Sequence, residues 1–260
     1  MQLHRSSGVL MHVSSLYGSD SIGGFGQEAR EFIDFLADCG FGWWQVLPFC
    51  MSDEYNSPYK SFSAFGGNPY FVDIRRLREE GLLSAAEVEA VRETTPFSAE
   101  YGYLYRTRLD LLRRAAERTD AAERARVAAF LTDNPYLAQF CDFMARRRAN
   151  GDLPWCRWQD AAARDEQEYE AWGFIQYRFM SQWQVIHDYA AHRGVKILGD
   201  MPIYVSYDSC DVFANREQFL LDAAGAPTAV AGCPPDYFAK DGQLWGNPLY
   251  DWKRMEQDGY

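Results

Sequence analysis

Apolar runs and helically spaced apolar residues alternate at the start of the chain. Residues 8–11, Gly-Val-Leu-Met, form a short apolar run typical of a buried strand. Residues 43–47, which end before Pro48, have the character of a second strand. Between them, a helix is predicted over 27–39, with four apolar residues at helical spacing: Ala29, Phe32, Phe35 and Leu36. Gly40 then takes the position of a C-terminal cap. Strand, helix and strand in this order predict parallel pairing with a right-handed crossover.

The alternation stops after Pro48, and helical signals dominate from about 75 to 150. Ser84 and Glu87 have the spacing of a capping box at a helix start. Asn134 is expected to cap the last helix of this region, with Pro135 at its first position. The helices expected after the capping box cover residues 103–118, 121–131 and 135–149. An apolar stripe in the last of them is expected to pack in the core: Leu137, Phe140, Cys141 and Met144.

A second strand-and-helix unit follows. A long helix is expected over 161–193, ended by Gly194, and residues 195–198 are expected to form a strand. In barrels of alternating strands and helices, residues just past a strand's carboxyl end line the active face. Asp200 is therefore a candidate for chemistry or substrate contact, with a simple loop-capping role as the alternative. Beyond it, a helix start is expected at 208–211 and a hairpin over 219–230, turning at 222–225.

Composition and charge limit the classes of partner that the chain is expected to bind. The chain has 260 residues, enough for one large domain or two small ones. Its formal charge of -11 argues against nucleic acid, because phosphate binding needs clustered cations. The run of arginines at 146–148 is expected to be a solvated helix end. No apolar run approaches the ~20 residues that span a bilayer, so no membrane contact is expected.

Cysteine and histidine spacing gives no sign of a disulfide framework or a metal site. The six cysteines are scattered without a C-x-x-C pair, which is typical of reduced, cytoplasmic thiols. His187 and His192 lie five residues apart on the expected long helix, off the three- or four-residue spacing that places two ligands on one face. We expect no metal.

Two loop-like stretches combine turn residues with aromatic rings. Residues 232–252 contain two adjacent prolines, which fix φ, and glycines, which permit conformations that other residues rarely adopt. The backbone of this stretch is therefore expected to be preset. Flat rings beside amides and carboxylates suit a ligand with apolar faces and many hydroxyls, such as a sugar. Capping of a hydrophobic core is the alternative for this stretch. Residues 56–70 have the same composition. The side chains that the first stretch presents are Asp236, Tyr237, Phe238, Gln243, Trp245, Asn247 and Tyr250.

These two stretches, with Gly-Asp-Met-Pro-Ile-Tyr-Val at 199–205 and Arg-Ser-Ser-Gly-Val-Leu-Met-His at 5–12, resemble the amylomaltases, the 4-alpha-glucanotransferases of glycoside hydrolase family 77. The resemblance extends from about Arg5 to Tyr260. It implies an α/β fold, a (β/α)8 TIM barrel that is incomplete in this chain because only about three barrel strands can be counted, with an inserted helical subdomain. The expected division is 1–74 for the first barrel strands and active-site loop, 75–150 for the helical insertion, and 151–260 for the continuing barrel with a substrate-covering loop, the remainder of the barrel being absent.

The resemblance also implies transfer of alpha-1,4-glucan segments between maltooligosaccharides, without a cofactor. The expected mechanism is a retaining double displacement. The family's nucleophile lies in an Arg-x-Asp-His-type motif after the next barrel strand, and its acid/base follows later. Neither motif occurs in residues 1–260. The chain is expected to supply the supporting half of the active site.

Individual roles follow from the matched motifs. Tyr59 is expected to stack on the sugar at the cleavage point, with Ser57 nearby. Asp200 is expected to support the nucleophile, and Tyr101 to belong to a second glucan groove. A flexible loop over the acceptor side is expected to contain Asp236, Tyr237, Phe238, Gln243 and Trp245. A catalytically inactive glucan-binding fragment and a hydrolytic alpha-glucan relative are the alternatives, and the oligomeric state stays open.

Overall fold

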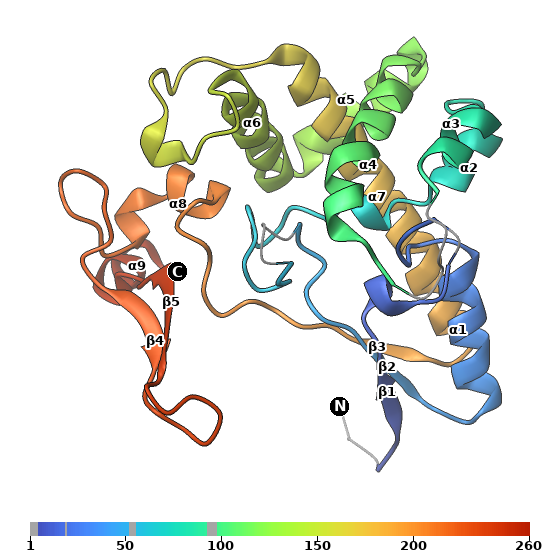
Figure 1. Ribbon diagram of the computed structural model, residues 1–260, viewed down its shortest axis with the longest axis horizontal. Coiled ribbons are helices and arrows are strands. Elements are labelled where there is room, and N and C mark those ends of the chain that lie inside the picture. Colours follow the sequence, from blue (N-terminus) through green and yellow to red (C-terminus); the bar gives the residue numbers. More distant parts are fainter. Residues whose placement is uncertain (1–4, 19, 52–55, 93–97) are drawn as a thin grey trace.

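The computed structural model describes residues 5–18, 20–51, 56–92 and 98–260. Its centre is a parallel sheet in the order β1-β2-β3, formed by β1 (Gly8–Leu10), β2 (Trp43–Gln45) and β3 (Lys196–Leu198). Val9 of β1 pairs with Trp44, which pairs with Ile197. The expected strands and their parallel pairing are confirmed (Figure 1).

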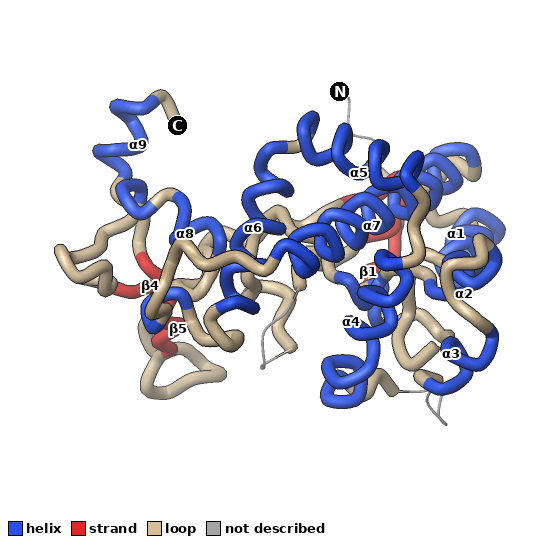
Figure 2. The backbone as a smooth tube through the Cα atoms, turned by 90° about the horizontal axis from the view of Figure 1, so that it is seen from above, coloured by secondary structure: helices blue, strands red, loops and turns tan. Residues whose placement is uncertain are grey.

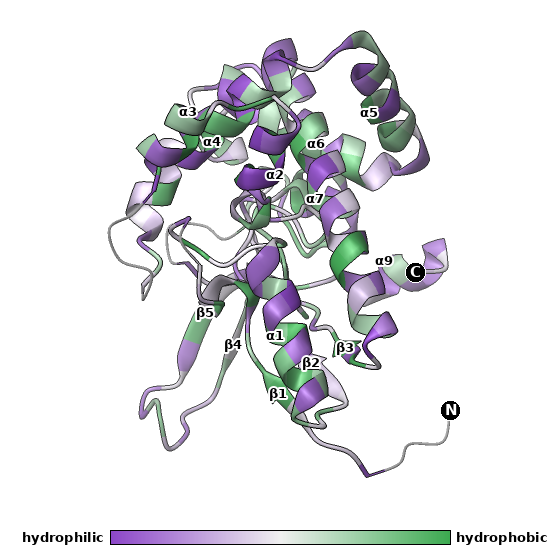
Figure 3. Cartoon of the chain, turned by 90° about the vertical axis from the view of Figure 1, so that its right-hand side faces the viewer, coloured by the Kyte–Doolittle hydropathy of each residue, from purple (hydrophilic) through white to green (hydrophobic). Residues whose placement is uncertain are grey.

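Helix α1 (Gln27–Asp38) is the crossover from β1 to β2. It buries Ala29, Ile33 and Leu36, whereas the ring of Phe35, expected on the apolar face, is exposed. The buried face of α1 is therefore rotated relative to the expected one, with Ile33 and Leu36 packed into the core. Figure 3 shows hydrophobic residues along β1 and β2 beside α1, which itself alternates between hydrophilic and hydrophobic colouring.

Only one face of the sheet is covered in the described structure. Side chains alternate along a strand, so Val9, Trp44 and Ile197 share the face that packs against the core. Leu10 and Leu198 point the other way and are exposed. The prediction that residues 8–11 form a buried strand is therefore wrong for one face.

The helical region expected after β2 is present. Its helices are α2 (Ile74–Glu79), α3 (Ala85–Ala90), α4 (Tyr101–Glu117), α5 (Ala121–Asp133) and α6 (Pro135–Ala149). Ser84 and Glu87 form the expected capping box, and Pro135 begins α6. The side chain of Asn134 does not cap α6; its amide donates to the carbonyl of Phe130 instead. The apolar stripe of α6 is buried as expected.

Helix α7 (Glu166–His192) links this helical region to the sheet. It packs against α1, α4, α5 and α6 and leads into β3 after Gly194, whose φ of 75° suits glycine. The helix begins later than expected because Asp160 accepts hydrogen bonds from Ala162 and Ala163, which form a turn. The N-cap is Asp165, which accepts from the backbone N–H of Glu168.

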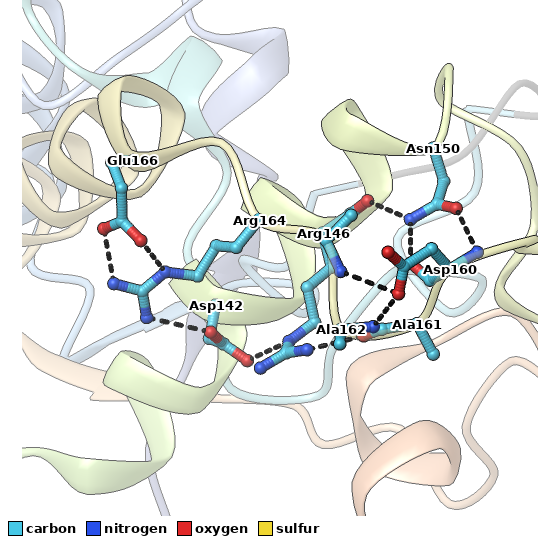
Figure 4. Close-up of polar contacts among 9 residues, drawn as sticks. Asp142, Arg146, Asn150, Asp160, Ala161, Ala162, Arg164 and Glu166 are labelled. Carbon is cyan, nitrogen blue, oxygen red and sulfur yellow. Dashed lines mark hydrogen bonds and ion pairs between the residues drawn. The ribbon is translucent and has the colours of Figure 1, made fainter.

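An ion-pair network fixes the connection between α6 and α7 (Figure 4). Arg164 pairs with Glu166 and, across the connection, with Asp142 of α6. Arg146 donates to Asp142 and to the carbonyl of Ala161. The network ties both ends of the connection to the same helix.

The arginines at the end of α6 are not all solvated, contrary to the prediction. The guanidinium of Arg147 pairs with Asp208 at 2.6 Å and lies 4.5 Å over the ring of Phe62. Asp208 also accepts from the backbone N–H of Trp155. Arg147 therefore joins α6 to the segment that precedes α8 (Cys210–Ala214).

The last part of the chain holds an antiparallel hairpin that sequence patterns did not predict. β4 (Val230–Cys233) pairs with β5 (Gln243–Pro248), inside the stretch expected to be a constrained loop. The turn expected at 222–225 is confirmed by the hydrogen bond from Asp222 N–H to Ala226 O. α9 (Trp252–Asp258) follows. Figures 1 and 2 show the β4–β5 hairpin apart from the parallel sheet.

Short 3-10 turns complete the secondary structure, at Val13–Ser15, Pro69–Phe71, Trp155–Arg157 and Arg216–Gln218. Within the described ranges, no helix is both long and apolar enough to cross a membrane.

Candidate active site

Tyr59 and Asp200 meet beyond the carboxyl end of β3, although 141 residues separate them. The phenol of Tyr59 donates to Oδ2 of Asp200 at 2.6 Å. This bond raises the pKa of Tyr59, with partial burial and the charge of Asp200 adding to the effect. Asp200 is exposed, and nearly half of Tyr59 is accessible. The predicted supporting carboxylate and the predicted stacking ring thus form one unit.

Ser57 belongs to the same unit. Its Oγ accepts from the backbone N–H of Tyr59 at 3.3 Å, and its carbonyl accepts from the N–H of Lys60. These bonds close a turn over residues 57–60. The turn sets the direction in which Tyr59 leaves the backbone.

The remainder of the 56–70 loop is held by one of its own side chains and by residues of α7 and α8. Ser63 Oγ accepts from the backbone N–H groups of Phe65 and Gly66, and Asp211 at the start of α8 accepts from the N–H of Ala64. Gly67 lies so close to α7 that an added Cβ would meet the ring of Phe179 at 2.4 Å. The loop is a rigid support for Tyr59.

Two buried glutamines of α7 bind the backbone at the end of this loop. Gln176 accepts from the N–H of Gly67 at 2.8 Å and donates to its carbonyl at 3.0 Å. Gln182 makes the same pair of bonds to Asp73, at 2.8 and 3.3 Å. Sequence reasoning missed both residues, because a glutamine inside a long amphipathic helix carries no local signal for such a role.

The segment after Asp200 connects this unit to the β4–β5 hairpin. The carbonyl of Ile203 accepts from the phenol of Tyr250 at 3.1 Å. The ring of Tyr204 lies 6.2 Å from Trp245 and is stacked on Tyr250, with 6.3 Å between centroids. Contacts along residues 200–205 therefore tie the hairpin to the end of β3.

The hairpin tip carries the predicted loop residues. Tyr237 and Phe238 are 94% and 90% exposed and contact one another edge to face. Asp236 shapes the tip, because its carboxylate accepts from the N–H groups of Phe238 and Ala239. The tip presents two rings to solvent.

Gln243, Trp245 and Asn247 lie on β5. The indole N–H of Trp245 donates to the side-chain oxygen of Gln243 at 3.0 Å, and both residues are exposed. Asn247 differs, because its side chain is buried and its amide donates to the carbonyl of Val205 at 2.9 Å. Its observed contact is with the protein backbone.

Tyr101 is the first residue of α4, a helix that Figure 1 shows apart from the β4–β5 hairpin. It packs partly against the core, 6.3 Å from the ring of Tyr105. The phenol of Tyr105 donates to the side chain of Asn56, at the beginning of the Tyr59 loop. The N-terminal part of α4 therefore contacts that loop through Tyr105.

His12, just past the carboxyl end of β1, is a half-buried polar residue that sequence analysis did not select. Its ring lies 5.4 Å from Phe71 and 6.1 Å from Phe49. Nδ1 has no hydrogen-bond partner within the described part of the chain. Burial lowers the pKa of His12 to about 4. The imidazole is neutral at pH 7.

The described residues contain no group of three or more His, Cys, Asp or Glu side chains arranged to hold a metal ion. The two histidines of α7 that were considered for a metal are exposed.

Parallel strands joined by helices, with a carboxylate and a ring paired past the end of a strand, place the chain among the (β/α)-barrel proteins. Comparison with known families narrows this class. The family model described as 4-alpha-glucanotransferase matches residues 11–260, and the chain belongs to this family, glycoside hydrolase family 77.

Curated relatives agree with this assignment. The 4-alpha-glucanotransferase of Streptococcus pneumoniae is 41% identical over 272 residues, which cover 98% of this chain and 54% of that protein. That of Thermus thermophilus is 39% identical over 100% of this chain and 55% of its own length. The chain therefore spans about half the length of these relatives.

Solved structures agree on the fold. The amylomaltase from Streptococcus agalactiae in complex with acarbose matches with a TM-score of 0.93 at 35% identity, over 98% of this chain and 55% of that one. The match supports the interpretation of the fold as an incomplete barrel with helical additions.

Proposed function

We propose that this chain is part of a 4-alpha-glucanotransferase that moves alpha-1,4-glucan segments between maltooligosaccharides by a retaining double displacement. The observation that carries the proposal is the Tyr59–Asp200 pair at the end of β3, in a chain of this family. A ring fixed by a carboxylate at a barrel's active face suits a sugar, which offers apolar C–H faces and hydroxyl groups. The acarbose bound to the similar amylomaltase supports an oligosaccharide ligand.

In this proposal Tyr59 stacks on the sugar at the cleaved bond, and Asp200 holds the ring in place. Oδ1 of Asp200 accepts no hydrogen bond from the residues that the structure describes, so it is free to bind a sugar hydroxyl or to support the nucleophile. Ser57 sets the turn that presents Tyr59. Asp200 is a supporting residue, because retaining transfer needs two further carboxylates about 5 Å apart. We assign those two to sequence outside residues 1–260.

The hairpin tip is proposed to cover the acceptor side. Tyr237 and Phe238 hold their rings in solvent, and Gln243 with Trp245 offers an amide and an indole on the same hairpin. Closure of this tip over a bound glucan would exclude water and favour a sugar hydroxyl as the attacking group. Asp236 and Asn247 serve mainly by fixing the tip and the base of the hairpin.

Tyr101 is proposed to contact glucan in a second groove at the start of α4. The helical region of residues 75–150 is proposed to be an inserted subdomain, between barrel parts at 1–74 and 151–260. The enzyme is proposed to be cytoplasmic and to need no cofactor.

Maltotriose disproportionation tests the proposed function. The complete gene product would be incubated with maltotriose, and glucose and longer maltooligosaccharides would be followed by chromatography. Transfer produces both at a constant number of reducing ends. A rising number of reducing ends would identify a hydrolase instead. Absence of any product, with glucan binding intact, would identify a binding protein. Residues 1–260 alone serve as the comparison, and products from them would contradict the assignment of the nucleophile to another segment.

A further inference from the structure

An exposed pair of aromatic rings joins the Tyr59 loop to the helical region. Phe65 of the loop and Tyr136 in the first turn of α6 lie 5.4 Å apart, with their planes at 56°. Phe65 is 62% exposed and Tyr136 is 43% exposed. Together they form an angled apolar surface.

The backbone that carries Phe65 and the phenol of Tyr136 are both held in place. The backbone N–H of Phe65 donates to Ser63 Oγ, and the next residue, Gly66, lies against the buried ring of Phe140, where an added Cβ would approach within 2.6 Å. The phenol of Tyr136 donates to Asn134 at 3.0 Å. Phe140 and Tyr136 are one turn apart on α6, so a single helix presents one ring and anchors the loop that carries the other.

Such fixed rings lose little conformational entropy when a ligand stacks on them, which favours binding. The size of the surface favours a sugar chain over a protein as the ligand. Two aromatic side chains offer roughly 300–500 Å² between them, whereas a stable protein interface buries about 1,200–2,000 Å². A sugar chain needs only a ring face for each residue it stacks.

Position along the loop points to the same ligand. Phe65 follows Tyr59 by six residues, which limits their Cα separation to about 20 Å. A long glucan held at Tyr59 is therefore long enough to extend to the ring pair, while a short one has few sugars left to do so.

We propose that Phe65 and Tyr136 form an additional binding surface for alpha-1,4-glucan, used by the part of a long chain remote from the cleaved bond. This proposal rests on the proposed function for its ligand. The surface favours long glucans over short ones. It is distinct from the hairpin tip and from Tyr101.

The test uses the complete gene product with Phe65→Ala, Tyr136→Ala and the double variant. Phe65→Tyr and Tyr136→Phe keep the rings and serve as matched controls. Amylose binding is measured as retardation in native gels that contain amylose. The ratio of kcat/KM for amylose to kcat/KM for maltotriose is measured in solution.

We expect the double variant to lose most of its retardation and its kcat/KM ratio to fall about tenfold, since each stacked ring contributes part of that factor. The ring-keeping variants should behave as the wild type. Unchanged retardation in the double variant would overturn the proposal, as would an equal loss of efficiency on both substrates, which would mean that the pair only holds the Tyr59 loop. A wild type that binds amylose but does not disproportionate maltotriose would overturn the proposed function. The retardation of the double variant would then still show whether Phe65 and Tyr136 bind glucan.

Discussion

Gln176 of α7 and Gly67 of the Tyr59 loop exchange two hydrogen bonds inside the core, with the amide of a side chain taking the place of a neighbouring strand. Gln176 is fully buried, and Gly67 is in contact with Phe179. A buried backbone N–H and C=O must both be paired, and here one glutamine pairs both. The loop that carries Tyr59 thus depends on a helix more than 100 residues away.

Gln176→Leu should destabilise the fold by about 2–4 kcal/mol, because it leaves the N–H and C=O of Gly67 buried and unpaired. Urea denaturation of the two proteins measures the difference. Gln184→Leu is the matched control: it changes an exposed glutamine of the same helix and should shift stability by no more than about 0.5 kcal/mol. Equal effects of the two substitutions would contradict the structural role of Gln176.

Tyr59→Ala should lower kcat/KM for maltotriose by a factor that corresponds to about 1–3 kcal/mol, because the stacking face and its buried area are lost. Tyr59→Phe should lower it less, since the ring remains and only the bond to Asp200 goes. Tyr189→Phe removes a similar Tyr–Asp bond, between α7 and Asp34 of α1, and controls for lost stability. Unchanged efficiency in Tyr59→Ala would show that this ring does not contact the substrate.

Stability should fall as pH drops from about 6.5 toward about 4 through protonation of His12. The pKa of His12 is lowered in the folded state, so the unfolded chain binds the proton first and protonation favours unfolding. The stability that the neutral imidazole contributes is complete above the pKa of the unfolded chain. It is lost as pH falls through the pKa of the folded protein. His12→Phe should show a shallower decline of unfolding free energy over this window than the wild type, and the exposed-site variant His192→Gln should match the wild type. Parallel pH profiles for His12→Phe and wild type would contradict the effect.

Arg178 should be a strong contributor to the stability of the helical region. Its guanidinium joins Glu80, just after α2, and Glu123 of α5 to α7, and it is largely buried together with Glu123. Arg178→Met removes the cation that Glu80 and Glu123 share, which leaves Arg76 beside the first and Arg126, at 3.7 Å, beside the second. It should cost about 3 kcal/mol in thermal or urea unfolding.

A second substitution separates this charge effect from packing. Adding Glu123→Gln to Arg178→Met should recover part of the loss, because it removes a largely buried charge whose remaining partner is Arg126 at 3.7 Å. Arg92→Met, which breaks the exposed pair with Glu89, is the control and should be close to neutral. A double variant as unstable as Arg178→Met would mean that lost packing, and not charge, causes the effect.

Local patterns predicted the elements whose signals lie within a few residues. The capping box at Ser84 and the proline that begins α6 mark helix starts through short-range hydrogen bonds and a fixed φ. The β4–β5 hairpin was missed because prolines and glycines in residues 232–252 favour turns. Its pairing depends on a close backbone approach at Gly232, where a Cβ would meet Gln243 O at 2.3 Å.

The sequence alone determined the family, the order of the parallel strands and their connecting helices, and the candidates Tyr59 and Asp200, because each rests on local motifs. The tertiary structure alone decided that the phenol of Tyr59 binds Asp200, that two glutamines of α7 hold the loop, and that Phe65 faces Tyr136. These contacts join residues more than 70 positions apart. No pattern within one segment specifies them, since they arise only when packing of α6, α7 and β3 brings the segments together.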